Sequence, residues 1–137
     1  MDPVFQSFLT GFPVLLVHFA VTLAILSAGI AAYHLITPYH ELRLIRAGNT
    51  AAALSFAGAI VGLAIPLAVC MASSVNLQDI VIWGFVTLLI QLLAFRIADL
   101  LLKGLPNRIE SGEMGAAILV FAIKIAVALI NAAAVSG

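Results

Sequence analysis

The stretch GNTAAALSFAGAIVGLAIP, residues 48–66, carries no charged side chain and repeats small residues at helical spacing. Gly58 and Gly62 stand one helical turn apart, and Pro66 follows on the same side one turn later. In a lipid bilayer, small residues at this spacing allow two helix backbones to approach closely. The stretch therefore predicts a membrane-spanning helix that packs against other helices.

The composition of the whole chain also indicates a bilayer environment. Of the 137 residues, 64% are hydrophobic and only 9% are charged, which is too apolar for a water-soluble domain of this size. The net charge is zero, so the chain lacks the excess of positive charge that is typical of nucleic-acid-binding proteins. The single cysteine, Cys70, provides neither a disulfide framework nor a metal-binding pair. We expect one integral membrane domain over residues 1–137, with the lipid bilayer as its surroundings.

Hydrophobic runs define the expected spans. A hydrocarbon core of ~30 Å takes about 20 helical residues to cross. Four runs reach that length, at residues 12–36, 50–72, 80–102 and 115–134. The chain start lacks the basic region and cleavage site of a signal peptide, so the first run is expected to remain as a span. The predicted fold is an all-α membrane protein with four transmembrane helices.

Basic residues in the connections predict the orientation. Arg43 and Arg46 lie between the first and second runs, and Lys103 and Arg108 lie between the third and fourth. The remaining connection and both tails have no Lys or Arg. Because cytoplasmic loops hold the excess of positive charge, both termini are expected on the periplasmic side of an inner membrane.

Both basic connections contain signals for helix ends. Gly48 is expected to end a short interfacial helix that begins at Pro38. Asn49 can then cap the second span, which satisfies backbone N–H groups at the membrane surface. Glu113 occupies the matching place before the fourth span, where its negative charge complements the helix dipole.

Matching residues in the two halves of the chain indicate an internal repeat. At nearly the same offset, Val21-Thr22-Leu23 matches Val86-Thr87-Leu88, Ile45 matches Ile109, Gly48 matches Gly112, and Ala52-Ala53 matches Ala116-Ala117. The halves would form two tandem helical hairpins, at residues 12–72 and 80–134. Because each hairpin crosses the membrane twice, the two copies are expected to share one orientation, as a parallel repeat.

Three segments resemble a known family. They are Thr37-Pro38 with Glu41, Leu44-Ile45, residues 48–52, Gly58, Gly62 and residues 65–67; Asp79 with Trp83 and residues 91–93; and Ala116-Ala117 with residues 130–133. With these, the chain resembles the YjfL-like bacterial inner-membrane proteins, a family of unknown function. The resemblance implies a four-helix inner-membrane protein with a duplicated hairpin, no established reaction and an association with envelope-stress systems. Glu113 and Lys124 depart from the family pattern.

Ionisable and amide side chains at membrane depth are costly and tend to mark function. Lys124 lies about ten residues into its span, roughly 15 Å deep at the helical rise, which is near mid-membrane. It either lines a polar interior or snorkels toward the surface. The residues that could form such a polar pathway are Lys124, Asn131, Asp99, Arg96, Gln91 and His18.

Most of these residues also have a structural interpretation. Asp99 can pair within its own helix with Arg96 or Lys103, although it is also the natural charged partner of Lys124. His18 lies one turn from Thr22, a spacing that favours an interhelical hydrogen bond over a ligand site. Asn131, on the side of Lys124, and Gln91 could extend a polar lining or bond between helices.

Small residues define the expected packing surfaces. Ala24 and Ala28 belong to a stripe on the first span that should pack against the second. Gly58, Gly62 and Pro66 are expected to be available for self-association, so we predict a homo-oligomer, most simply a dimer.

The sequence contains no recognisable reaction centre. It lacks His-Glu-x-x-His, Gly-x-Ser-x-Gly, paired intramembrane aspartates and paired cysteines. No catalytic residue, metal site or cofactor is predicted, and an enzyme is not expected. The first expectation is an oligomeric membrane component with envelope-stress partner proteins. The alternative is a channel or transporter for a small ion or solute, built around Lys124.

Overall fold

The computed structural model describes residues 2–37 and 40–137. Throughout that part of the chain the regular structure is helical: α1 (Pro3–Ile36), α2 (Glu41–Arg46), α3 (Thr50–Ser73), α4 (Leu77–Leu101), α5 (Leu105–Glu110) and α6 (Met114–Ser136). Four of these helices, α1, α3, α4 and α6, are long and apolar enough to cross a membrane. The predicted all-α architecture with four spans is confirmed.

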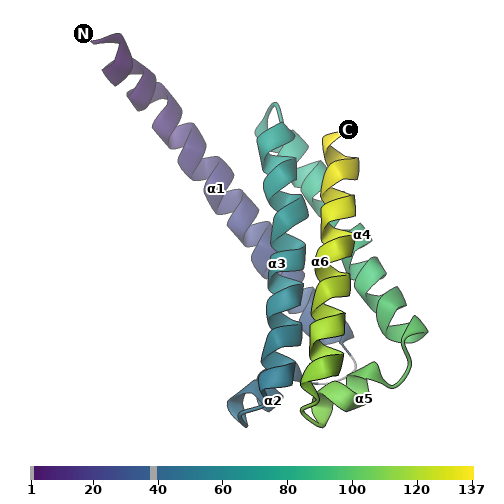
Figure 1. Ribbon diagram of the computed structural model, residues 1–137. Coiled ribbons are helices and arrows are strands. Elements are labelled where there is room, and N and C mark those ends of the chain that lie inside the picture. Colours follow the sequence, from purple (N-terminus) through teal and green to yellow (C-terminus); the bar gives the residue numbers. More distant parts are fainter. Residues whose placement is uncertain (1, 38–39) are drawn as a thin grey trace.

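Helix α1 begins nine residues earlier than the predicted span, at Pro3 rather than residue 12. Asp2 is its N-cap, and the Asp2 carboxylate accepts a hydrogen bond from the Val4 backbone N–H at 3.0 Å. Thirty-four helical residues extend over about 50 Å, which exceeds a ~30 Å hydrocarbon core. Accordingly, α1 crosses the other helices obliquely, and its first half projects away from them (Figure 1).

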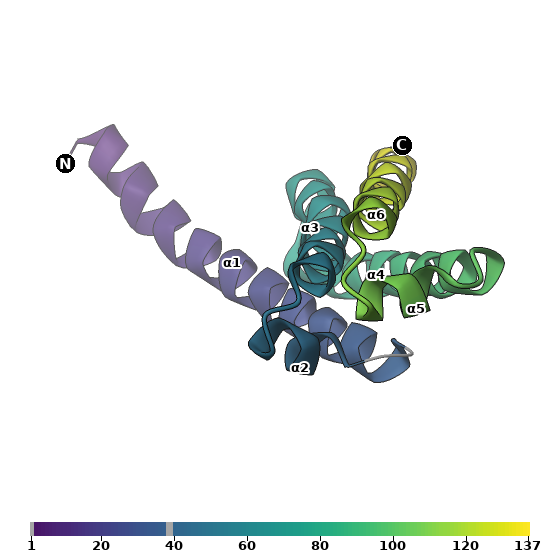
Figure 2. The same ribbon diagram turned by 60° about the horizontal axis from the view of Figure 1, so that its bottom comes forward.

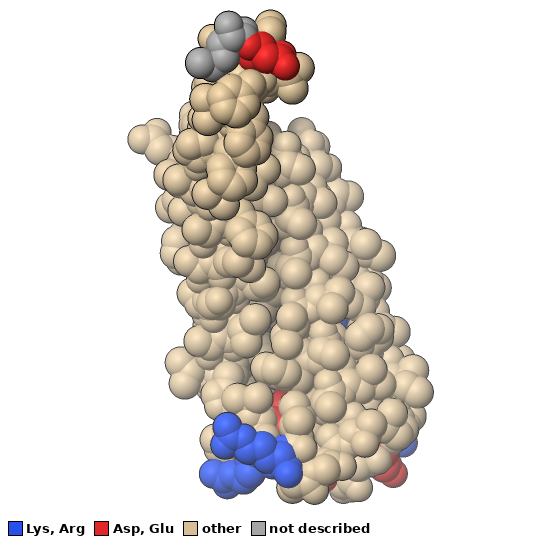
Figure 3. Space-filling model, turned by 90° about the vertical axis from the view of Figure 1, so that its left-hand side faces the viewer, with Lys and Arg blue, Asp and Glu red and all other residues tan. Residues whose placement is uncertain are grey.

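Helices α3 and α6 run side by side in the same direction, while α1 and α4 pack beside them (Figures 1 and 2). Both termini and the α3–α4 connection lie at one end of the bundle, called here the terminal end. The opposite end holds α2, α5 and the basic residues Arg43, Arg46, Lys103 and Arg108, and is called here the basic end. One face of the molecule shows a Lys and Arg patch at this end and an almost uncharged surface above it (Figure 3).

The inner surface of α1 differs from the predicted alanine stripe. Ala24 and Ala28 are exposed, whereas Ile25, Gly29 and Tyr33 are buried against the bundle. An added Cβ at Gly29 would lie 2.5 Å from Leu88 Cδ1, so the Leu88 side chain would have to move to admit it. The predicted packing of Ala24 and Ala28 against the second span is wrong, because the side of α1 one position further on, with Ile25, Gly29 and Tyr33, is the buried one.

Gly58 and Gly62 form the surface of α3 that contacts α6 within one chain. An added Cβ at Gly58 would lie 3.3 Å from Phe121 Cα, and one at Gly62 would lie 3.3 Å from the Lys124 carbonyl oxygen. Pro66 is buried as well. The small-residue packing expected for this stretch is present, but α6 already covers it. The expectation that Gly58 and Gly62 remain available for self-association is therefore wrong.

The connections before α3 and α6 have the same local geometry. Gly48 and Gly112 both adopt positive φ, at 91° and 87°. The Gly48 N–H donates to the Ile45 carbonyl at 3.0 Å, and the Gly112 N–H donates to the Ile109 carbonyl at 2.9 Å. Gly48 follows α2 as predicted, but that helix begins at Glu41 with His40 as N-cap; the expected start, Pro38, lies outside the described residues. The relation between the two complete hairpins stays a prediction.

Candidate functional site

Lys124 lies inside the bundle, on the side of α6 that faces α3. Only 4% of its surface is exposed. Its Nζ donates to the Tyr33 hydroxyl at 2.5 Å, to the Ser55 carbonyl at 2.8 Å and to Ser55 Oγ at 2.9 Å. The three donors of an ammonium group thus meet three oxygen acceptors, which compensates for the loss of water.

Glu41 provides the negative charge of the same site. It is the first residue of α2 and is 1% exposed. The Tyr33 hydroxyl donates to Glu41 Oε1 at 2.5 Å, and Ser55 Oγ donates to the same oxygen at 3.4 Å. The ammonium and the carboxylate are therefore linked through two hydroxyl groups. We call Tyr33, Glu41, Ser55 and Lys124 the charged cluster.

Aromatic rings enclose the charged cluster. Lys124 Nζ lies 4.7 Å from the centroid of the Tyr33 ring and 5.7 Å from that of Phe95. Both distances allow a cation–π attraction. The Tyr33 and Phe95 rings meet edge to face, with centroids 5.8 Å apart. The site is thus both charged and shielded from solvent, which strengthens the attraction between the opposite charges.

A second polar group lies further along α6, toward the terminal end. Asn131 Nδ2 donates to Gln91 Oε1 at 3.0 Å and to the Thr87 carbonyl at 3.1 Å. Gln91 Nε2 donates to the Lys124 carbonyl at 3.5 Å, and Gln91 is completely buried. We call Thr87, Gln91 and Asn131 the amide cluster. The structure brings Lys124, Gln91 and Asn131 together along one interior line, as the pathway hypothesis requires.

The other candidate residues lie outside this line. Asp99 and Arg96 are half-buried on α4, and Asp99 forms no ion pair with Arg96, Lys103 or Lys124, all of which are described. Lys124 is joined through hydroxyl groups to Glu41, and the predicted pairings of Asp99 stay predictions. Asp99 and Lys124 line a common cavity of about 10 Å³, which has room for about one water molecule.

His18 is half-buried and lies in the first half of α1. Its backbone carbonyl accepts a hydrogen bond from Thr22 Oγ1 at 2.7 Å, within the helix. Fifteen residues separate it from Tyr33, or about 22 Å along a helix, so His18 does not reach the charged cluster.

A larger hollow lies at the terminal end. It has a volume of about 370 Å³, and Cys70, Ser74, Asp79 and Trp83 are among its lining residues. Trp83 is 53% exposed, as expected for an anchor at the membrane surface. Along α6, Asn131 of the amide cluster lies between Lys124 and the residues Ala134, Val135 and Gly137 that line this hollow.

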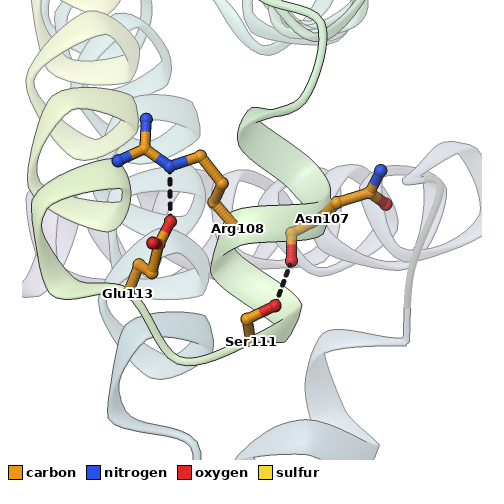
Figure 4. A network of polar contacts seen from close by, with 4 residues as sticks. All are labelled: Asn107, Arg108, Ser111 and Glu113. Atoms are coloured by element: carbon orange, nitrogen blue, oxygen red, sulfur yellow. Dashed lines mark hydrogen bonds and ion pairs between the residues drawn. The ribbon is translucent and has the colours of Figure 1, made fainter.

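The segment before α6 is held by contacts of its own. Glu113 is the N-cap residue of α6, yet its carboxylate makes no capping hydrogen bond; it forms an ion pair with Arg108 instead (Figure 4). Ser111 Oγ donates to the Asn107 carbonyl at 3.0 Å in the same turn (Figure 4). The charge of Glu113 therefore lies close to the start of α6 but is balanced by a basic side chain.

Asn49 has a second role that the cap prediction missed. Its Oδ1 accepts from the Ala52 N–H at 3.0 Å, which is the expected cap. Its Nδ2 also donates to the carbonyl oxygens of Ile109 and Glu110, at 3.0 and 3.1 Å. Asn49 thereby joins the start of α3 to the end of α5.

The carboxylate and hydroxyl partners of Lys124 were missed by sequence reasoning. Glu41 appeared only as a motif position, and Tyr33 and Ser55 were not candidates. A single acidic residue in a connection that otherwise carries arginines was the available signal for Glu41. Within the described residues, no group of three or more His, Cys, Asp or Glu side chains is placed to hold a metal ion.

Comparison with known proteins identifies relatives of the chain. Residues 7–135 match the family model described as Domain of Unknown Function (DUF350). The chain is 33% identical to the UPF0719 inner membrane protein YjfL of Escherichia coli K12 over 116 aligned residues. The aligned region covers 85% of this chain and 88% of the relative. The YjfL protein of Escherichia coli O157:H7 matches with the same identity and coverage. No solved structure matches.

These matches agree with the membrane architecture. The relatives are named inner-membrane proteins, and the chain has four helices that can span a bilayer. The resemblance stated from the sequence motifs is confirmed. This chain is a multi-pass inner-membrane protein and belongs to the DUF350 family, with the YjfL proteins as relatives.

Proposed function

We propose that the protein is a conduit for a small ion and that this structure is its closed state. The observation that carries the proposal is the ammonium group of Lys124, buried between α1, α3 and α6 and linked by hydroxyl groups to Glu41. An ionisable side chain held at this depth by a full set of hydrogen bonds indicates a functional site in a membrane protein.

The arrangement of polar groups supports a route along the bundle axis. Glu41 lies at the basic end, Lys124 follows inside, and the amide cluster continues toward the hollow at the terminal end. The cavity beside Lys124 has room for about one water molecule. The proton is therefore the ion whose passage requires the least opening, and Glu41, Tyr33 and Lys124 can each hold or release one.

Flux through the purified protein in liposomes tests this function. A pH-sensitive dye inside the vesicles reports proton entry when a potassium diffusion potential is applied. Wild-type protein is expected to raise the rate several-fold over empty vesicles, and Lys124→Met to return it to background. The matched control is Lys103→Met, which removes the same charge from an exposed position at the basic end. Equal rates for wild-type and protein-free vesicles would refute the conduit.

A second candidate function is an oligomeric envelope component, and the surface of α1 supports it. The first half of α1 projects from the bundle, and in its second half Ala24 and Ala28 are exposed on the side away from the buried residues. Small residues on an exposed helix face allow close contact with a second copy. We propose a homodimer through this face, which could then engage partner proteins of the envelope-stress response. Neither candidate function involves a catalytic step or a cofactor.

Cross-linking in native membranes tests the dimer. Ala28→Cys is expected to give a disulfide-linked dimer on mild oxidation. Leu93→Cys, on an exposed face of α4, is the matched control and should remain monomeric. Dimers from Leu93→Cys alone would place the contact on α4 and reject the α1 interface.

A further inference from the structure

A basic hollow lies at the basic end, where α1 ends and α2 begins. It has a volume of about 270 Å³ and is lined by His34, His40, Leu42, Arg43 and Arg46. The rings of His34 and His40 are 6.0 Å apart, centroid to centroid. None of these described lining residues is acidic, so positive charge and N–H donors from two elements converge on one space.

The position of α2 is fixed by contacts on its opposite side. Glu41 is buried and accepts the hydrogen bond from Tyr33, whereas Arg43 and Arg46 are exposed. The arginines are thus presented by a short helix that is tied to the bundle. Figure 3 shows the Lys and Arg patch at this end as a compact group.

We propose that this hollow binds a phosphate group, and specifically the phosphodiester of an anionic phospholipid headgroup. Guanidinium groups donate paired hydrogen bonds to phosphate oxygens, and each imidazole offers at least one N–H in either protonation state. Basic pockets beside transmembrane helices on the cytoplasmic side are suited to anionic headgroups.

Apolar side chains next to the hollow favour a lipid over a soluble phosphate. Leu42 lines the hollow and is 41% exposed; Leu35, which follows the lining residue His34 in α1 but does not itself line the hollow, is 82% exposed. An acyl chain that leaves a bound headgroup would find these side chains at the membrane surface. A free phosphate ion would use only the arginine and histidine groups.

Lipid retention measured by native mass spectrometry tests the proposal. The protein is reconstituted in nanodiscs containing equal amounts of phosphatidylglycerol and phosphatidylcholine and then released into detergent. Wild-type protein is expected to retain phosphatidylglycerol preferentially. Arg43→Gln with Arg46→Gln should lower that retention about tenfold or more, given the contribution of each basic residue to headgroup attraction. If the double variant aggregates, Arg46→Gln alone should still lower retention several-fold.

The matched control is Lys103→Gln with Arg108→Gln, which removes two positive charges from the same end but outside the hollow. Its retention of phosphatidylglycerol should equal that of the wild type. Equal loss in both double variants would overturn the proposal, because it would indicate general surface attraction. The absence of any preference for phosphatidylglycerol in the wild type would also overturn the lipid assignment.

Inorganic phosphate distinguishes the two sources of the ligand. If the hollow is specific for lipid, millimolar phosphate should neither displace phosphatidylglycerol nor raise the melting temperature of lipid-free protein. Phosphate stabilisation that depends on Arg43 and Arg46 would instead assign the hollow to a soluble phosphate compound. The arginines lie outside the charged cluster, so these results are independent of the flux assay.

Discussion

At the residue scale, Lys124 and Glu41 depend on each other. Neither charge has access to bulk water, and the hydroxyl groups of Tyr33 and Ser55 join them. Removing one member of a buried pair leaves the other charge without its counter-charge, which is far more costly than removing both. The energetic role of Lys124 therefore includes holding α2 against the bundle through Glu41.

Lys124→Met is expected to lower the free energy of unfolding by about 3–5 kcal/mol, because the Glu41 carboxylate loses its counter-charge. Lys124→Met with Glu41→Gln should be less destabilised than the sum of the single variants. Unfolding in detergent, followed by circular dichroism, measures the double-mutant cycle. The control Lys103→Met should change stability by less than about 0.5 kcal/mol. Additive effects of the two substitutions would contradict the coupling.

Substitution of Gly62 tests whether the close approach of α3 and α6 stabilises the protein. A Cβ at this position would lie 2.9 Å from Phe95 Cζ and 3.3 Å from the Lys124 carbonyl oxygen, and the Phe95 ring is itself buried. Gly62→Ala is therefore expected to destabilise the protein by about 1–3 kcal/mol.

Gly115→Ala is the matched control for this substitution. Gly115 is also within a helix, but an added Cβ there meets nothing within 4 Å. Alanine should raise stability by up to about 1 kcal/mol through helix propensity. The thermal midpoints of the two variants should move in opposite directions, and a shared direction would argue against the packing explanation.

At the element scale, Asn49 connects two helices from different halves of the chain. It caps α3 and bonds to the last carbonyl groups of α5. Its counterpart before α6, Glu113, has no amide group and bonds to Arg108 on α5. The two halves thus share the glycine turn but differ in the side chain that follows it.

Asn49→Ala is expected to lower stability by about 2–3 kcal/mol, the sum of a lost cap and of lost bonds to α5. Asn76→Ala is the control, because Asn76 caps α4 through the Asp79 N–H at 2.9 Å and is exposed. It should cost only about 1 kcal/mol. Hydrogen exchange should show faster opening of α5 in the Asn49 variant alone, and unchanged α5 protection would contradict the second role of Asn49.

At the scale of the whole molecule, charge and termini are segregated. The basic connections lie at one end of the bundle, and both chain ends lie at the other. This arrangement suits the prediction that the basic end faces the cytoplasm, because short cytoplasmic loops hold the excess of Lys and Arg.

Alkaline phosphatase fused after residue 137 is therefore expected to be active in the periplasm, while green fluorescent protein at the same place should be dark. Fusions truncated after Gly104 are the control and should give the reverse pattern. Fluorescence from the carboxyl-terminal fusion would contradict the predicted topology and indicate the opposite orientation. In that orientation the basic hollow would face the outer surface of the membrane.

Several features of the site could be predicted from local sequence. Lys124, Gln91 and Asn131 stand out because polar side chains are rare in apolar spans, and the structure does place them in the interior. Glu41 was not expected as a partner of Lys124, because depth along the membrane was the only guide to distance. Glu41 lies in a connection and is joined to Lys124 through the Tyr33 hydroxyl, and only the folded chain shows this.

The amino-acid sequence by itself determined that this chain spans a membrane four times, since the hydrophobic effect acts on each run independently of its neighbours. It also determined the glycine turns and the cap at Asn49, which depend on a few adjacent residues. The tertiary structure decided which helix surfaces meet, so that residues 48–66 pack on α6 and α1 uses Ile25, Gly29 and Tyr33. Lipid solvates every apolar face equally well, so close fit and buried hydrogen bonds between distant segments select the partners.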